Sequence, residues 1–386
     1  MVSGGGVDVH QHLWTESFVA ALRRRRRPPR LDGWTLHLDG EPPSDLDPVA
    51  HDPDRRAALV RADGVDRALI SLSSPLGIEY LPPEEAAPLL AAYHDDAAGL
   101  GAPFGAWAAA GLREIDAPGL ADRLDQGFAG LQLPATALAD DAGYAHCAPL
   151  LGLLEARDLP LFVHPGPVRA PRLPKNPDLS GEGGVALPNT GLSPDGVANR
   201  ESPEHRQSPS LYGLHYADAG TGGTPVPDPR RGRAPYRAVE TGGKPDDSPQ
   251  TGTPVWWAAM VPYVQQMHAA WFAFHAYGRP RHPRLRVCFA LLAGLAPLHE
   301  ERLGARGGDP RGVVDGGVYL ETSSYGPRAV DAAIRVLGID VIVNGSDRPY
   351  ASPLELGHGH GLGEAAGHAL RVNNPARLLT RRGTPS

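Results

Sequence analysis

The sequence predicts an α/β protein, a (β/α)8 TIM barrel with a long Pro/Gly-rich insertion between strands five and six. Three observations support this fold: short β-rich runs alternate with helical stretches, the runs number eight, and a single connection, residues 165–253, is far longer than a barrel loop. Alternation of strand and helix indicates a parallel sheet, and eight units favour a closed barrel over an open sheet. We expect residues 1–386 to form one barrel domain.

The expected strands are short apolar runs bounded by turn residues. They cover residues 7–13, 68–73, 103–109, 130–134, 159–164, 285–290, 318–322 and 341–345. Helical periodicity lies between most of them, for example over residues 83–98, 144–157 and 328–337. The order of these segments is that of a repeated strand-helix unit.

The insertion, residues 165–253, has no sustained periodicity and consists of proline and glycine for about a third of its length. Loops after barrel strands emerge at the end of the barrel where active sites lie. Two interpretations stay open: a cover over that end, or a flexible segment with no catalytic part.

Composition excludes several classes of protein. A hydrophobic fraction of 41% excludes disorder throughout, and a net charge of −7 gives no general attraction to nucleic acid.

The basic run at residues 23–27 precedes Pro28 and fits a solvated helix end, with anion recognition as the alternative. Cys147 and Cys288 stand alone in apolar stretches, and no apolar run reaches the length of a membrane span. We therefore expect a cytoplasmic protein acting on a small-molecule substrate, and self-association into a homo-oligomer stays open.

Four residues with metal-binding side chains stand at the ends of expected strands. His10 and His12 are two residues apart in the first run, so both side chains point to one face. His164 ends the fifth run and Asp347 follows the eighth. The carboxyl ends of barrel strands meet at one end of the barrel, and three imidazoles with one carboxylate suit Zn²⁺ or a similar divalent ion.

The motifs around these residues resemble those of the amidohydrolase superfamily. The similarity is to its amidohydrolase-related branch, which contains the 2-amino-3-carboxymuconate 6-semialdehyde decarboxylase type of enzyme. The residues are VDVHQHLW at 7–14, LFVHPG at 161–166, NGSDRP at 344–349, LAGLAPLHEERL at 292–303 and NPARLL at 374–379. This resemblance implies that His10, His12 and His164 are metal ligands and that Asp347 is a ligand or the nearby base.

The resemblance also predicts the number of ions. Related enzymes bridge two metals with a lysine on the fourth strand, but residues 130–134 contain none, and Lys175 and Lys244 lie in the insertion. We therefore expect one ion, most plausibly zinc, that activates water while Asp347 accepts a proton.

One position departs from the family pattern. The family commonly has a histidine near the end of the sixth strand, where this sequence has Leu291. His299 follows on the expected next helix as an exposed or packed residue. A second pair, His358 and His360, lies among glycines and fits a loop, with weak metal capture as the alternative.

Other side chains near the expected strand ends are candidates for substrate binding. The set is Trp14, Trp107, Trp256, Ser324 and Arg348. Core packing is an equal interpretation for the tryptophans, and capping of the next helix is one for Ser324.

Three functions are compatible with this site. The leading interpretation is a metal-dependent enzyme that hydrolyses a C–N or C–O bond of a small organic substrate with metal-activated water. The second is a non-oxidative decarboxylase of an unsaturated or aromatic carboxylic acid, and the third is a non-catalytic binding barrel.

Overall fold

The computed structural model describes residues 5–171, 253–309, 314–354 and 362–381, which belong to one compact unit. Eight parallel strands lie at the centre of this unit, and each overlaps one of the expected runs. One sheet contains β1 (Val7–Gln11), β5 (Arg67–Ile70) and β6 (Phe104–Ala106). The other contains β7 (Leu131–Pro134), β8 (Leu161–His164), β9 (Val287–Phe289), β10 (Val318–Glu321) and β11 (Ile342–Val343).

The eight strands do not form one continuous closed sheet, and this corrects the expected closed barrel. The two sheets meet at two seams, where the described residues form the isolated bridges Gln11–Arg348 and Ala108–Leu131 and a few further backbone hydrogen bonds. The reason is strand length, because β11 spans two residues and β6 spans three. Such short strands end before a regular ladder of hydrogen bonds can develop across the seam.

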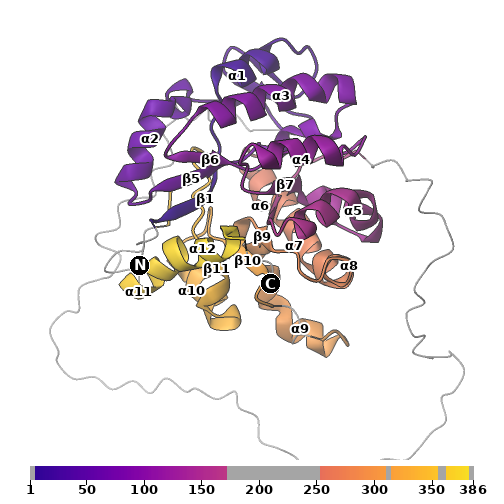
Figure 1. Cartoon of the computed structure of the whole chain (residues 1–386), viewed down its shortest axis with the longest axis vertical. Helices are drawn as coiled ribbons and strands as arrows, with labels where there is room; N and C mark the ends of the chain where they lie inside the picture. The colour runs from indigo at the N-terminus through magenta and orange to yellow at the C-terminus, as the bar shows by residue number, and fades with distance from the viewer. Residues whose placement is uncertain (1–4, 172–252, 310–313, 355–361, 382–386) are drawn as a thin grey trace, which may run out of the picture. The chain divides into compact units, whose positions relative to one another are not determined.

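Helices surround the strands (Figure 1). Those before the insertion are α1 (Glu16–Arg23), α2 (Pro53–Ala62), α3 (Pro83–Gly99), α4 (Ala117–Asp125) and α5 (Asp141–Ala156). Those after it are α6 (Trp257–Met260), α7 (Pro262–Ala273), α8 (Arg279–Arg281), α9 (Glu300–Ala305), α10 (Pro327–Leu337), α11 (Gly363–His368) and α12 (Asn374–Leu379). No helix in these parts of the chain is long and apolar enough to cross a membrane.

A small antiparallel sheet between α1 and α2 was not expected. It consists of β2 (Arg30–Asp32), β3 (Thr35–His37) and β4 (Ser44–Asp45). Strands of two or three residues are too short to show an alternating pattern in the sequence. The basic run ends α1 as expected, and Arg25 and Arg27 both pair with Glu85 of α3, at 2.9 and 2.6 Å.

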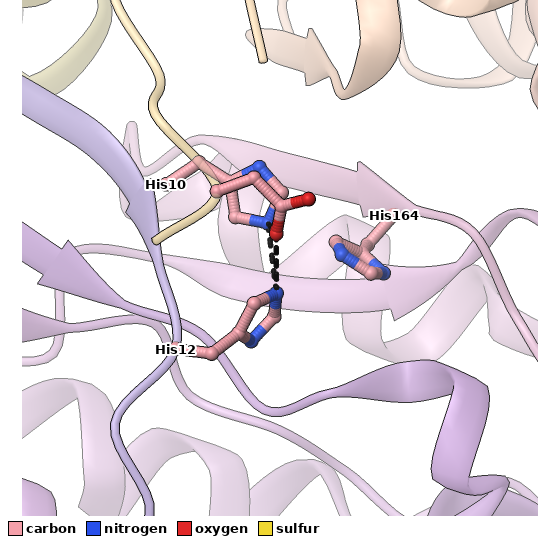
Figure 2. Close-up of side chains that lie close together, drawn as sticks. His10, His12 and His164 are labelled. Carbon is pink, nitrogen blue, oxygen red and sulfur yellow. Dashed lines mark hydrogen bonds and ion pairs between the residues drawn. The ribbon is translucent and has the colours of Figure 1, made fainter. Parts of the chain in front are cut away.

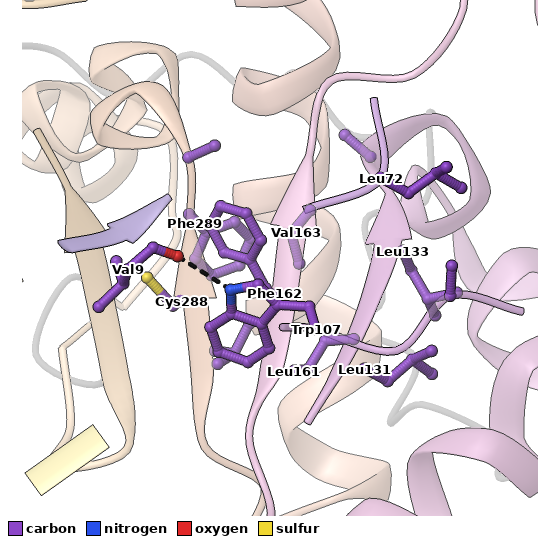
Figure 3. Close-up of a cluster of buried hydrophobic side chains, with 14 of the residues drawn as sticks. Val9, Leu72, Trp107, Leu131, Leu133, Leu161, Phe162, Val163, Cys288 and Phe289 are labelled. Carbon is purple, nitrogen blue, oxygen red and sulfur yellow. Dashed lines mark hydrogen bonds between the residues drawn. The ribbon is translucent and has the colours of Figure 1, made fainter. Parts of the chain in front are cut away.

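The main core lies among the strands and the helices that cover them. Trp107 is fully buried there, its ring stacks on Phe162 at 5.2 Å between centroids, and its indole N–H donates to the Val9 carbonyl at 2.9 Å (Figure 3). Cys147 and Cys288 are buried and unpaired, as expected. Strands buried on both faces explain why the eight runs are so uniformly apolar.

The expected insertion falls largely outside the described residues, which stop at residue 171 and resume at residue 253. His358 and His360 also lie outside the described residues. The boundaries of the insertion and the loop interpretation of these histidines stay predictions.

Glu79 is a buried carboxyl group that makes stability depend on pH. Ser74 donates a hydrogen bond to one carboxyl oxygen, while the other has no partner within the described parts of the chain. Burial raises the pKa of Glu79 from 4.5 to about 7. Between these two pH values the folded protein keeps a proton that the unfolded chain releases. The contribution of this carboxyl group to the free energy of unfolding is therefore fully present below pH 4.5 and is lost as the pH rises to 7.

We expect Glu79→Gln to match the wild type near pH 4.5 and to be more stable at pH 8, by on the order of 3 kcal/mol. Urea unfolding at the two pH values measures the difference. The exposed Glu301→Gln serves as the control. Equal stability of Glu79→Gln and wild type at pH 8 would contradict the raised pKa.

Candidate metal centre

Three histidines and one aspartate converge at the carboxyl ends of the strands. The candidate ligand atoms of His10, His12, His164 and Asp347 all lie within 4.8 Å of one another. Figure 2 shows the three imidazole rings facing a common space. The histidines are buried, and the Asp347 side chain is 16% exposed, so this carboxylate is the most accessible member of the group.

The strands explain why these residues meet. His10 lies on β1 and His12 directly follows this strand, so the alternation of the chain points both rings to one side. His164 is the last residue of β8, and Asp347 follows β11 in a turn where its φ is 58°. Aspartate tolerates this left-handed conformation better than most residues.

Each histidine has its Nδ1 atom beside an oxygen that can only accept a hydrogen bond. The acceptors are Glu321 Oε1 for His10 at 3.2 Å, the Ser71 carbonyl for His12 at 3.0 Å, and the Pro165 carbonyl for His164 at 2.8 Å. These partners assign the ring proton to Nδ1 in all three side chains. The lone pair of each neutral ring is then on Nε2.

The residues present fit a divalent cation. His10 Nε2 and His12 Nε2 are 3.0 Å apart, and Asp347 Oδ1 lies 3.2 Å from His12 Nε2 and 3.6 Å from His10 Nε2. Two nitrogen lone pairs at such a distance repel each other unless a cation lies between them. Ligand atoms at about 2.0–2.1 Å from a tetrahedral Zn²⁺ are about 3.3 Å apart, which matches these separations.

Burial and the neighbouring charges set the ionisation of the group. Burial holds the pKa of His12 and of His164 below the ordinary value. Burial also acts to lower the pKa of His10, but the charges of Glu321 and Asp347 outweigh it and raise that pKa. Burial acts to raise the pKa of Asp347, and the facing histidines outweigh it and lower that pKa. These directions favour neutral rings at His12 and His164 and an ionised Asp347, and a metal ion bound at His10 would take the place of the proton that the raised pKa favours there.

Glu321, at the end of β10, is a residue of this site that the sequence did not reveal. Its carboxylate accepts hydrogen bonds from the backbone N–H groups of Leu291 and Ser323, both at 2.7 Å, and faces His10. Gly345 leaves room for it, because a Cβ there would lie 2.1 Å from Glu321 Oε2. A carboxylate behind a ligating histidine fixes the ring and makes it a better donor.

We expect Glu321→Gln to weaken divalent-metal binding by roughly 10–100-fold, because the His10 ring loses its charged acceptor. Competition against a chromogenic chelator measures the dissociation constant. The control is Glu155→Gln, which changes a carboxylate 3.6 Å from His282 Nδ1, outside the four-residue cluster. An unchanged dissociation constant for Glu321→Gln would remove this residue from the site.

The segment that follows β9 has an unusual backbone. Five consecutive residues, Leu291 to Leu295, have φ between 46° and 61°. A left-handed conformation costs roughly 1–2 kcal/mol for each residue with a side chain. At Gly294 a Cβ would lie 2.5 Å from the Val264 carbonyl, so only glycine fits there. This strained turn directs the Leu291 N–H to Glu321, and His299 lies exposed at the end of the same segment.

Three of the five candidate substrate-binding residues are buried or bonded to other side chains. Trp14 is buried and donates to Ser73 Oγ at 3.1 Å, which itself lies 3.1 Å from His12 Nδ1. Trp14 therefore lies behind His12, a candidate ligand, whereas Trp107 lies within the core. The Arg348 guanidinium donates to both carboxylate oxygens of Asp63, each at 2.8 Å.

The other two candidates lie on the surface of the described part of the chain. Trp256 is 59% exposed just before α6, and Ser324 is exposed with a φ of 62°. Within the described parts of the chain, no side-chain hydrogen bond, ion pair or ring contact joins these five candidates to the four candidate ligands, and their role in substrate binding stays a proposal.

Comparison with known proteins identifies the fold. No protein-family model and no curated protein matches the sequence. Among solved structures, the IDCase of Metarhizium anisopliae is 17% identical over 97% of this chain and 97% of its own, with a TM-score of 0.63. The 5-carboxyvanillate decarboxylase of Sphingomonas paucimobilis is 15% identical over 98% and 99%, with a TM-score of 0.59.

A third solved structure contains a metal. It is a dihydroxybenzoic acid decarboxylase from a Polaromonas species with bound manganese and the inhibitor 2-nitroresorcinol, 16% identical over 97% of each chain, with a TM-score of 0.54. A protein named amidohydrolase II also has this fold. The chain therefore has the α/β fold of these solved structures, which agrees with the predicted resemblance at the level of the fold.

Proposed function

We propose that this protein is a divalent-metal-dependent, non-oxidative decarboxylase of hydroxylated aromatic carboxylic acids. The observation that supports the proposal is the cluster of His10, His12, His164 and Asp347 at the strand ends of a fold shared with decarboxylases of such acids. The sequence favoured hydrolysis, but the named activities among these structural relatives support its alternative.

Zinc is the ion that we propose, because three imidazoles and one carboxylate are a common zinc donor set. Manganese is the alternative, supported by the ion in the dihydroxybenzoic acid decarboxylase. His10, His12 and His164, with Asp347 beside them, would hold the divalent ion, which would supply positive charge to attract an anionic substrate.

The side chains then have distinct roles. The three imidazoles would hold the ion. Asp347, the most accessible member of the cluster, is ionised before the reaction, so it first takes up a proton from water and then carries it to the substrate. Its carboxyl group transfers that proton to the ring carbon bearing the substrate's carboxylate. The carbon–carbon bond then breaks, its electron pair stays on the ring, carbon dioxide leaves, and water restores the proton to Asp347.

The test is to incubate the metal-loaded protein with 2,6-dihydroxybenzoate and with 5-carboxyvanillate. We expect carbon dioxide and loss of the acid in equal amounts, and none of either with His12→Ala. Parallel incubations with aromatic esters and amides test hydrolysis. Cleavage of those without carbon dioxide would replace this proposal with hydrolysis, and loaded protein without turnover would support a binding barrel.

Hydrolysis stays the second candidate because of Leu291, which occupies the position of the histidine common in the family. Leu291→His tests this departure. A gain in carbon dioxide release would support the decarboxylase site, while a variant that decarboxylates no acid would support the hydrolytic alternative.

A further inference from the structure

Arg56 is a buried cation immediately outside the metal cluster. Its side chain is 1% exposed and comes from α2. Nη1 donates to the carbonyls of His12 at 2.7 Å and Ala50 at 3.2 Å. Nη2 donates to Gln11 Oε1 at 2.5 Å and to the Arg348 carbonyl at 3.2 Å. Besides Ala50, which lies near Arg56 in the sequence, the guanidinium therefore binds two distant segments, one at residues 11–12 and one at residue 348.

Both segments contain metal-binding residues. The His12 carbonyl belongs to a candidate ligand, and the Arg348 carbonyl belongs to the residue after Asp347. The His12 N–H donates to the same Arg348 carbonyl at 2.7 Å, and the Asp347 N–H donates to the His10 carbonyl at 2.9 Å. Together with the Val9 N–H, which donates to the Asn344 carbonyl at 2.9 Å, these contacts join the two sheets at a seam that has one isolated bridge and no regular ladder. Arg56 supplies additional hydrogen bonds where the sheet has few.

A second chain of contacts starts at the same guanidinium. Gln11 Nε2 donates to Asp8 Oδ2 at 2.7 Å, and Asp8 Oδ1 accepts from the N–H groups of His10 at 3.1 Å and Ser346 at 3.0 Å. Burial lowers the pKa of Arg56 only to about 10, so the guanidinium is charged at neutral pH. Hydrogen bonds from a charged donor are about twice as strong as neutral ones.

We propose that Arg56 is a positioning residue for the metal centre, holding the His12 and Asp347 segments at the separation that one ion requires. The inference rests on the metal centre of the proposed function and not on which reaction occurs there. A purely structural role would affect the stability of the fold without a specific effect on metal affinity.

A second buried arginine provides a matched control. Arg286 directly precedes β9 and is also 1% exposed. Its guanidinium donates to the backbone carbonyls of Asp158, Arg377, Leu378 and Thr380, and it pairs with the Asp158 carboxylate at 3.2 Å. None of these residues is adjacent in sequence to a candidate metal ligand. Replacing either arginine removes a comparable set of hydrogen bonds, but only one set holds the metal-binding segments.

The experiment compares Arg56→Met, Arg56→Lys and Arg286→Met with the wild type, as full-length protein. The dissociation constants of Zn²⁺ and Mn²⁺ are measured by competition with a chelator, at a temperature below the melting temperature of every variant. The visible spectrum of Co²⁺-loaded protein reports the geometry of the ligands. We expect both Arg56 variants to bind metal about 10–100-fold more weakly, with a changed Co²⁺ spectrum, as for other residues that orient ligands. Arg286→Met is expected to lower the melting temperature and keep the wild-type affinity and spectrum.

Wild-type affinity in the Arg56 variants would overturn the inference while leaving the metal centre intact. An equal loss of affinity in Arg286→Met would also overturn it, because the effect would then follow from stability alone. Arg56→Lys decides the question if Arg56→Met does not fold, since lysine keeps the charge but loses the forked geometry. A wild-type protein that bound neither ion would overturn the metal centre itself and this inference with it.

Discussion

Replacing His12 with alanine is expected to remove the metal from the protein while the barrel stays folded. The wild type should bind about one divalent ion per chain, because the four donors form a single group. Without the His12 imidazole only three protein donors remain. His10 Nε2 and Asp347 Oδ1 then lose His12 Nε2, which lies 3.0 Å and 3.2 Å from them. The apolar core around Trp107 is built from side chains other than these four, so we expect the fold to persist without the ion.

Metal analysis of protein purified without added metal measures this result, with circular dichroism as the test of folding. His94→Ala is the control, because His94 is a buried histidine that accepts a hydrogen bond from the Ala109 N–H and lies outside the cluster. Unfolding of His12→Ala but not of His94→Ala would indicate a structural metal. Two tightly bound ions per wild-type chain would contradict the single site.

Replacing Asp347 with asparagine is expected to lower kcat by roughly 100-fold or more, the usual scale for loss of an acid-base group. Asparagine has nearly the same size but can neither give nor take the proton. The three imidazoles remain, so the variant should retain substantial metal. The expected result is therefore a metal-containing protein with little turnover.

Turnover and metal content are measured on the same preparation of Asp347→Asn. Asp340→Asn is the control, since this carboxylate lies on the surface and pairs with Arg377 at 2.9 Å. Near-normal kcat in metal-loaded Asp347→Asn would remove the carboxylate from the chemistry and leave it a ligand at most.

The strands and the convergence of the four candidate metal ligands could be predicted because their signals are local. Each strand is a short apolar run, and His10, His12, His164 and Asp347 each stand at the end of one. The rule that parallel strands end at one side of a barrel then brings distant residues together. No information about pairs of distant residues was needed for this step.

The residues that orient the ligands could not be predicted, because their signals are pairwise and long-range. Glu321 meets His10 across 311 positions of the sequence, and Arg56 reaches the Arg348 carbonyl across 292. In the sequence, Arg56 lies in a polar helix and has no feature that distinguishes it from the neighbouring Arg55. The left-handed turn after β9 was also not predicted, because leucine and alanine normally avoid that conformation.

The seam between β1 and the segment after β11 would give a bound ion a mechanical role. His10 and His12 lie on or directly after β1 of the three-stranded sheet, whereas His164 and Asp347 lie on or after strands of the five-stranded sheet. An ion held by the three histidines would therefore join the two sheets. Its binding free energy would oppose their separation, so loss of the ion would first loosen the joint beside Asp347.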